Sequence, residues 1–212
     1  TLLQYKKFRY SYSDSGDAKF QKQYLGNFFE LLLDSGYKQD EGQYFTPIPI
    51  AKFIVWSLPI KEIIEENLKK KKGKFLPYVM DYACGSGHFL TEVIEEIQHI
   101  VNEIKPEYDK ATNKEIEFIK SNTLWTEEFI YGIEKDYRLA RTSKVACFMH
   151  GDGEATIIFG DGLEDYNEKG KTLAQGYDII IANPPYSVHG FKPHIQKLGD
   201  KYSLYEHLTD TS

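Results

Sequence analysis

Residues 81–90 read DYACGSGHFL, and this stretch carries the clearest structural signal in the chain. It follows a short apolar run at 78–82 and leads into a helical pattern over 89–103. Glycines in such a position permit a tight turn from strand to helix and let a ligand approach the backbone closely. The spacing differs from the Gly-x-Gly-x-x-Gly pattern of dinucleotide sites, so a nicotinamide-dependent enzyme is disfavoured.

Three further apolar runs have the length and composition of strands, at residues 129–133, 156–159 and 178–182. Helical patterns at 113–121 and 136–149 lie between several of these runs. The alternation of strand and helix predicts an α/β fold, in which helices cover both faces of a parallel sheet.

The N-terminal part of the chain is predicted to be helical. Residues 17–36 repeat apolar side chains at three- and four-residue spacing. A second helix is expected to begin at Pro47 with Thr46 as its N-cap, and a third to cover residues 60–70. The helix after Pro47 is expected to turn four apolar side chains inward, namely Ile50, Ile54, Val55 and Leu58.

The sequence Asn183-Pro184-Pro185-Tyr186 directly follows the last apolar run. Two consecutive prolines fix the backbone and remove two N–H donors. Their carbonyls and the side-chain oxygen of Asn183 therefore form a group of acceptors with few competing donors. Such a group suits an exocyclic amine, and Tyr186 offers a flat face on which a base can stack.

Two acidic residues follow the middle strands. Glu134 ends the second strand, where a carboxylate can accept hydrogen bonds from ribose hydroxyls. Its distance in sequence from Gly87 exceeds the usual ~20 residues, which an inserted helical stretch near 105–125 would explain. Asp161 follows the third strand and can accept from an adenine amino group, with Asp152 as a less well placed competitor.

Composition excludes several classes of protein. With 26 Lys and Arg against 32 Asp and Glu, the net charge of −6 argues against a chain that coats nucleic acid through charge alone. Two cysteines are too few for a disulfide scaffold or a Cys-rich zinc site, and the histidines lack ligand spacing, so we expect no metal. No apolar run reaches the ~18 residues that span a bilayer and no signal peptide is visible, so we expect a cytoplasmic protein.

Four motifs in this order resemble the N6-adenine DNA methyltransferases, and in particular the modification subunit of type I restriction–modification systems. They are GQYFTP at 42–47, DYACGSG at 81–87, the acid after the second strand, and NPPY at 183–186. The resemblance implies a Rossmann-like, S-adenosylmethionine-dependent methyltransferase sheet preceded by a helical segment.

The same resemblance sets the expected domain organisation. Residues 1–40 form the helical segment and residues 41–212 a partial catalytic domain. Sheets of this family have seven strands, whereas only about 26 residues follow Tyr186. We therefore expect the natural protein to contain more chain, on which catalysis would depend.

The resemblance also implies a cofactor and its contacts. S-adenosylmethionine would be wrapped by the residues around Phe45, with Glu134 on its ribose and Asp161 with Leu163 on its adenine ring. The implied cofactor-binding residues are Gln43, Tyr44, Phe45, Thr46, Pro47, Asp81, Ala83, Gly85, Ser86, Gly87, Glu134, Asp161 and Leu163.

The implied catalytic residues are Asn183, Pro184, Pro185 and Tyr186. Asn183 and the Pro184 carbonyl would accept the protons of the adenine amine and so localise its lone pair. The amine would then attack the sulfonium methyl group in line, with much of the rate supplied by positioning. The base must leave the duplex to reach the site, where Tyr186 would stack on it.

DNA is therefore the expected partner, together with a separate or downstream target-recognition (specificity) domain or subunit. A nuclease subunit joins them where the system cleaves DNA, because the chain has no Pro-Asp…Glu-x-Lys motif. Two alternatives stay open: methylation of RNA or of a protein glutamine, and a non-catalytic DNA-associated scaffold. The intact Asn183, Tyr186 and Asp81 count against a scaffold, which has no physical need for an acceptor cluster.

Overall fold

The computed structural model describes residues 46–70, 74–151, 155–164, 167–168, 171–172, 176–185 and 195. Several predictions fall outside these residues. They concern the helix at 17–36, the competitor Asp152, and the site residues Gln43, Tyr44, Phe45 and Tyr186.

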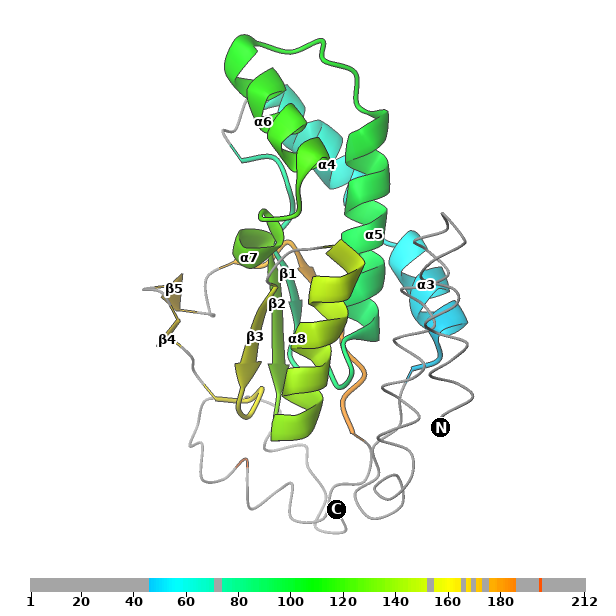
Figure 1. Cartoon of the computed structure of the whole chain (residues 1–212), viewed down its shortest axis with the longest axis vertical. Helices are drawn as coiled ribbons and strands as arrows, with labels where there is room; N and C mark the ends of the chain where they lie inside the picture. The colour runs from blue at the N-terminus through cyan, green and yellow to red at the C-terminus, as the bar shows by residue number, and fades with distance from the viewer. Residues whose placement is uncertain are drawn as a thin grey trace, which may run out of the picture.

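The main sheet has four strands in the order β3-β2-β1-β6. They are β1 (Val79–Asp81), β2 (Ile130–Glu134), β3 (Thr156–Phe159) and β6 (Ile179–Ile180). All three pairings are parallel, so the carboxyl ends of the strands lie at one edge, as the arrowheads of β1, β2 and β3 in Figure 1 show. The predicted parallel α/β sheet is confirmed.

Strand β6 is short, and a side chain extends its pairing with β1. The Asp178 carboxylate accepts from the Tyr78 backbone nitrogen at 2.8 Å, and the Asp178 nitrogen donates to the Tyr78 carbonyl at 2.9 Å. This reciprocal pair sets the register just before Val79 pairs with Ile179. A small antiparallel hairpin of β4 (Asn167–Glu168) and β5 (Lys171–Thr172) was not predicted, because two-residue strands carry no periodic signal.

The described helices agree with the predicted positions within a few residues, apart from the short α7, which was not expected. They are α3 (Ile48–Trp56), α4 (Ile60–Lys69), α5 (His88–Glu103), α6 (Lys110–Ser121), α7 (Thr126–Phe129) and α8 (Tyr137–Gly151). Helices α6 and α7 account for the long separation between Gly87 and Glu134. Within the described residues, no helix is long and apolar enough to cross a membrane.

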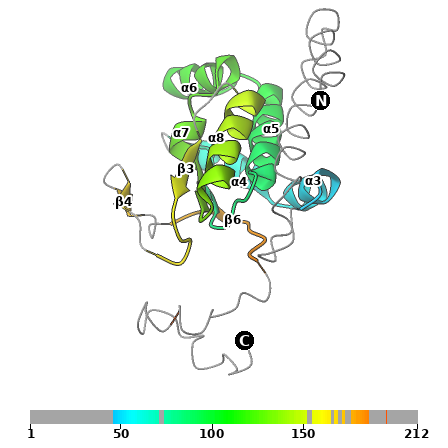
Figure 2. The ribbon, with the colours of Figure 1, turned by 60° about the horizontal axis from the view of Figure 1, so that its bottom comes forward.

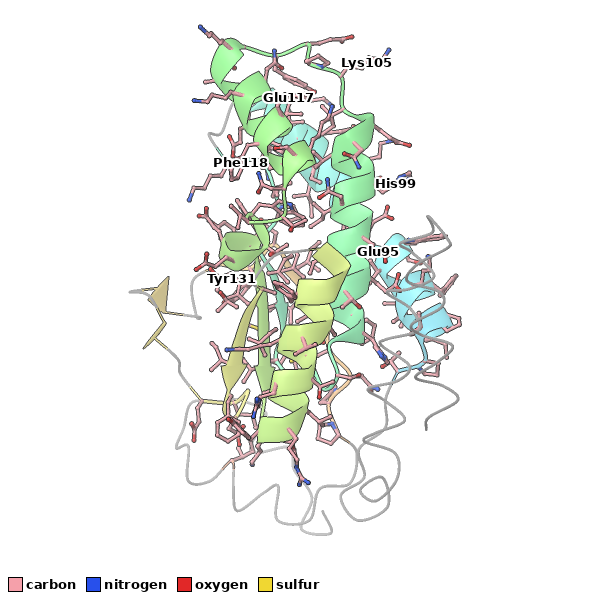
Figure 3. The ribbon with its side chains drawn as sticks, viewed as in Figure 1. Glu95, His99, Lys105, Glu117, Phe118 and Tyr131 are labelled. Carbon is pink, nitrogen blue, oxygen red and sulfur yellow. The ribbon has the colours of Figure 1, made fainter. Side chains whose placement is uncertain are left out.

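Helices α5 and α8 lie side by side over one face of the sheet (Figure 2). Leu90, Ile94 and Ile97 of α5 are fully or almost fully buried there, in the same core as Ile130 and Ile157. The outward side of α5 is polar, and its His99 lies 3.6 Å from Glu103 on that side (Figure 3).

The opposite face of the sheet is built differently. Its buried cluster consists of Met80, Tyr131 and Ile133, and the side chains packed against it come from strands and loops. Tyr177 meets Tyr131 edge-on, with the ring centroids 5.5 Å apart. Among the described residues no helix contributes to this cluster, so the expected helical cover of both faces is found on one face only.

Helix α3 is rotated from its expected orientation. Ala51 and Val55, one turn apart, are buried against α5, whereas Ile50 is 50% exposed and Ile54 is 36% exposed. The prediction that Ile50 and Ile54 point inward is therefore wrong. Leu58 is half-buried and packs against the core as expected. A small residue at position 51 allows close approach to α5, and this selects the buried side of α3.

Candidate functional site

The strand order defines a crevice. The chain runs outward from β1 to β2 and β3, and then returns to the other side of β1 as β6. In open α/β sheets, ligands bind outside the carboxyl ends of the strands at such a topological switch point. The loop after Asp81 and the segment that begins at Asn183 flank this point from its two sides.

The loop after β1 is held by hydrogen bonds that its backbone N–H groups donate. The Asp81 carboxylate accepts from the Ala83 nitrogen at 3.0 Å, and the Cys84 nitrogen donates to the Ile133 carbonyl at 2.9 Å. Gly85 and Gly87 have φ of 54° and 86°, in the left-handed region that favours glycine. A Cβ on Gly87 would lie 2.5 Å from Ser143 Oγ of α8, so glycine is required there for space as well.

Glu134 closes this loop from the end of β2. Its Oε2 accepts from the Gly85 nitrogen at 2.8 Å, and its Oε1 accepts from the Asp136 nitrogen at 2.7 Å. The predicted ribose acceptor thus supports the glycine loop directly, which the sequence did not indicate. Each carboxylate oxygen has a second acceptor site, so these two bonds still leave it able to accept from a hydroxyl.

The two acids of the site are buried at the ends of adjacent strands. Burial raises the pKa of Asp81 to about 7, with the Glu134 charge adding to the rise and the Ala83 N–H opposing it. Burial likewise raises the pKa of Glu134, against the hydrogen bonds from Asp136 and Gly85. The Glu134 charge therefore disfavours ionisation of Asp81, and buried carboxyl groups favour ligands that donate hydrogen bonds.

The loop after β3 packs directly on the loop after β1. A Cβ on Gly162 would lie 2.1 Å from the Tyr82 carbonyl oxygen, so only glycine permits this approach. Asp161 accepts from the Leu163 nitrogen at 3.1 Å and pairs with Lys135 at 2.9 Å. The predicted adenine-binding residues therefore lie beside the glycine loop, with Asp161 already engaged by a cation that sequence reasoning missed.

Asn183 contacts the segment before α3. Its Nδ2 donates to Thr46 Oγ1 at 3.1 Å, and the Thr46 carbonyl oxygen lies 3.0 Å from Nδ1 of His88. Thr46 was predicted to cap α3, and this is wrong. The N-cap is Pro47, without a side-chain cap bond, and the Thr46 hydroxyl accepts from Asn183 instead.

The remaining predicted site residues that the structure describes occupy the same edge. Ser86 is buried, Ala83 is half-buried, and Pro184 and Pro185 are exposed after Asn183. No side chain of a described residue caps α5 at Gly87, so the first-turn N–H groups of α5 suit an anionic ligand group. The site combines backbone donors, buried acids and an amide-proline acceptor group.

The fold is that of the S-adenosylmethionine-dependent methyltransferases. A putative class I enzyme of this kind from Listeria monocytogenes superposes with a TM-score of 0.52 at 17% identity, covering 96% of this chain and 50% of that chain. Residues 20–211 match the family described as N-6 DNA methylase, and the chain belongs to this family.

Two relatives illustrate the family. The type II restriction enzyme and methyltransferase RM.Eco57I of Escherichia coli is 27% identical over 79% of this chain and 21% of its own length. The type I restriction enzyme MjaVII methylase subunit of Methanocaldococcus jannaschii is 24% identical over 88% of this chain and 26% of its own length. The chain thus spans about a quarter of the length of these relatives.

Proposed function

We propose that this chain holds S-adenosylmethionine at the switch point and transfers its methyl group to the N6 amine of adenine in DNA, within a restriction–modification system. The observation that carries the proposal is the hydrogen bond between Asn183 and Thr46. It joins the acceptor group after β6 to the segment beside the glycine loop. The donor and acceptor of a methyl group must meet across such a junction.

The residues around the crevice fit the cofactor. The uncapped start of α5 suits a carboxylate, Glu134 suits ribose hydroxyls, and the loop at 161–163 suits an adenine ring. S-adenosylmethionine, when bound, supplies a methyl group already activated on a sulfonium centre. The other residues predicted from the sequence to bind the cofactor are part of this proposal.

Asn183 and Pro184 would act on the nucleophile. Their oxygens would accept hydrogen bonds from the two N–H groups of the adenine amine. These hydrogen bonds would localise the nitrogen lone pair, which is otherwise delocalised into the ring, and orient it toward the methyl group. In the transfer, the amine nitrogen would bond to the methyl carbon as the S–C bond breaks, the thioether S-adenosylhomocysteine would leave, and one amine proton would pass through the acceptor group to solvent. Asn183 and Pro184 thus orient the amine in line with the methyl group.

The names of the relatives support a role in DNA modification within a restriction–modification system. We propose DNA as the substrate and a target-recognition subunit or domain as the partner. A nuclease partner fits the type II and type I relatives, which are named restriction enzymes. RNA or protein-glutamine methylation and a non-catalytic scaffold are the competing functions, and no feature of the residues that the structure describes favours them.

The first test is a calorimetric titration with S-adenosylmethionine, with NADH as the control ligand. We expect saturable binding of the former only, and an affinity at least tenfold weaker, about 1.4 kcal/mol, in Asp81→Ala. Binding of NADH alone would contradict the proposal, as would Asp81→Ala binding with unchanged affinity.

The second test identifies the substrate. The longest natural form of the protein is incubated with cofactor labelled in the methyl group and with DNA, RNA or a glutamine-containing peptide in competition. We expect label in DNA, recovered as N6-methyladenine. Label recovered only in RNA or peptide would select a competing function, and binding without any transfer would favour the scaffold.

A further inference from the structure

His88 is one end of a hydrogen-bonded series of three residues, in which Thr46 is the middle member. It is the first residue of α5, and its Nδ1 lies 3.0 Å from the carbonyl oxygen of Thr46, a residue 42 positions earlier. The Thr46 hydroxyl in turn accepts from Nδ2 of Asn183, which is 137 positions later. The chain His88–Thr46–Asn183 therefore links the glycine loop, the start of α3 and the end of β6.

The hydrogen bond between His88 and the Thr46 carbonyl indicates which nitrogen of the imidazole ring carries a proton. A backbone carbonyl oxygen only accepts hydrogen bonds, so Nδ1 of His88 must carry the proton. The first turn of α3 does not use this carbonyl, because Ile50 and Ala51 both donate to the Pro47 carbonyl. A following proline also disfavours the helical conformation at Thr46, in keeping with a helix that begins only after Pro47.

The backbone of His88 lies between buried residues. Gly87 precedes it and is buried, and Phe89 and Leu90, which follow it, are 6% and 0% exposed. The imidazole ring is thus attached at the end of the glycine loop that we assign to the cofactor. Thr46 and Asn183, by contrast, are only half-buried.

We propose that His88 is a positioning residue for methyl transfer. By donating to the Thr46 carbonyl, it holds the Thr46 hydroxyl where that hydroxyl anchors the amide nitrogen of Asn183. The amide oxygen, at the other end of the planar carboxamide, is thereby set toward the target amine. This inference rests on the proposed function, and it assigns to His88 the alignment of the methyl acceptor with the cofactor loop.

The kinetic test uses two variants of His88 in the longest natural form of the protein. His88→Leu removes the donor, whereas His88→Asn can place an amide nitrogen near the position of Nδ1. We expect kcat to fall about 10- to 100-fold in His88→Leu, with KM for the cofactor changed less than about threefold. We expect His88→Asn to recover most of kcat. An unchanged kcat in His88→Leu would overturn the inference, as would a His88→Asn variant as slow as His88→Leu.

Thr46→Val provides the matched control because it removes the hydroxyl and keeps the carbonyl. If the two residues act in one chain, the double variant His88→Leu/Thr46→Val loses no more kcat than the slower single variant. Additive losses in the double variant would show that His88 acts through another route, and this would also overturn the inference.

A spectroscopic test separates failure of this inference from failure of the proposed function. Long-range ¹H–¹⁵N correlation spectra at alkaline pH report which ring nitrogen of His88 carries the proton, whether or not the protein is active. We expect the Nδ1–H form, and a shift of the Asn183 side-chain amide signals in His88→Leu. The Nε2–H form, or unmoved Asn183 signals, would overturn the inference. Absence of methyl transfer with the expected spectra would instead count against the proposed function.

Discussion

The two sides of the crevice are built in opposite ways. The loop after β1 is buried at Cys84, Ser86 and Gly87, and four of its backbone N–H groups donate hydrogen bonds that hold it. Gly85 and Gly87 have conformations that favour glycine. The segment after β6 is half-buried at Asn183 and exposed at Pro184, and a side-chain hydrogen bond joins it to Thr46. The first side depends on the core of the domain, and the second includes a contact between segments distant in the sequence.

Because of this difference, substitutions on the two sides should affect different properties of the protein. A change on the β1 side disturbs a loop packed against α8 and β2, so it should alter folding and cofactor binding together. A change at Asn183 removes a half-buried functional group that lies just after β6, a strand already paired with β1. It should therefore alter methyl transfer and leave folding and cofactor binding intact.

The largest expected effect is on the β6 side. Asn183→Ala should reduce methyl transfer by about 10³-fold, the upper end of what one preorganised hydrogen-bonding group supplies to a reaction. The amine would lose an acceptor for its protons. Methyl transfer to DNA is measured in the longest natural form of the protein, with calorimetric affinity for S-adenosylmethionine as the control. Retained transfer, or lost cofactor affinity, would contradict the separation of the two sides.

The next effect is a pH dependence on the β1 side. Burial raises the pKa of Asp81 from 3.8 to about 7, so the folded protein binds this proton more tightly than the unfolded chain. The stability that the protonated group contributes is present below about pH 4 and is lost as the pH rises to about 7. Asp81→Asn cannot ionise and keeps an acceptor for the Ala83 N–H.

The measurement is the free energy of unfolding in urea at several pH values between these limits. The stability of the wild-type protein minus that of Asp81→Asn should fall as the pH rises, by a few kcal/mol at most. A constant difference would show that Asp81 titrates alike in the folded and unfolded states. If the stability of the wild-type protein instead rose relative to that of the variant with increasing pH, the pKa of Asp81 would be lowered by folding.

A third prediction distinguishes backbone strain at Gly87 from steric contact between the glycine loop and α8. Gly87→Ala places a Cβ against Ser143 in a left-handed backbone and should cost about 2–4 kcal/mol of unfolding free energy. Gly176→Ala is the matched control, because Gly176 has φ of 63° and a Cβ there would meet nothing within 4 Å. It should cost only the backbone share, about 1 kcal/mol.

Adding Ser143→Ala to the Gly87→Ala variant should recover part of the difference, since it removes the oxygen that the new Cβ meets at 2.5 Å. Urea unfolding of the four proteins gives the comparison. Equal costs for the two glycine substitutions would show that contact with α8 does not constrain the loop.

The sequence predicts the β1 side better than the β6 side for a physical reason. The four main strands and the glycine loop follow from local patterns, since apolar runs and turn glycines act over a few residues. The rotation of α3 depends on how closely Ala51 approaches α5, which is a tertiary property. The hydrogen bond between Thr46 and His88 spans 42 positions and that between Thr46 and Asn183 spans 137, so no local sequence pattern predicts them.

The smallest expected effect tests the ion pair that Asp161 forms. Lys135 is 72% exposed and Asp161 is 14% exposed, so their 2.9 Å contact is open to water on the lysine side. Lys135→Gln should change the free energy of unfolding by less than about 1 kcal/mol, because solvent screens such a pair. The Leu163 N–H continues to hold Asp161 in place.

The effect on cofactor binding decides what the ion pair does. If Asp161 accepts from the adenine amino group, removing Lys135 leaves the Asp161 carboxylate with one competing donor fewer. Affinity for S-adenosylmethionine should then stay the same or rise slightly in Lys135→Gln, and it should fall in Asp161→Asn, which replaces one carboxylate oxygen with a donor. A loss of affinity in Lys135→Gln as large as that in Asp161→Asn would mean that the pair acts as a unit, with the lysine itself contributing to cofactor binding at the edge of the crevice.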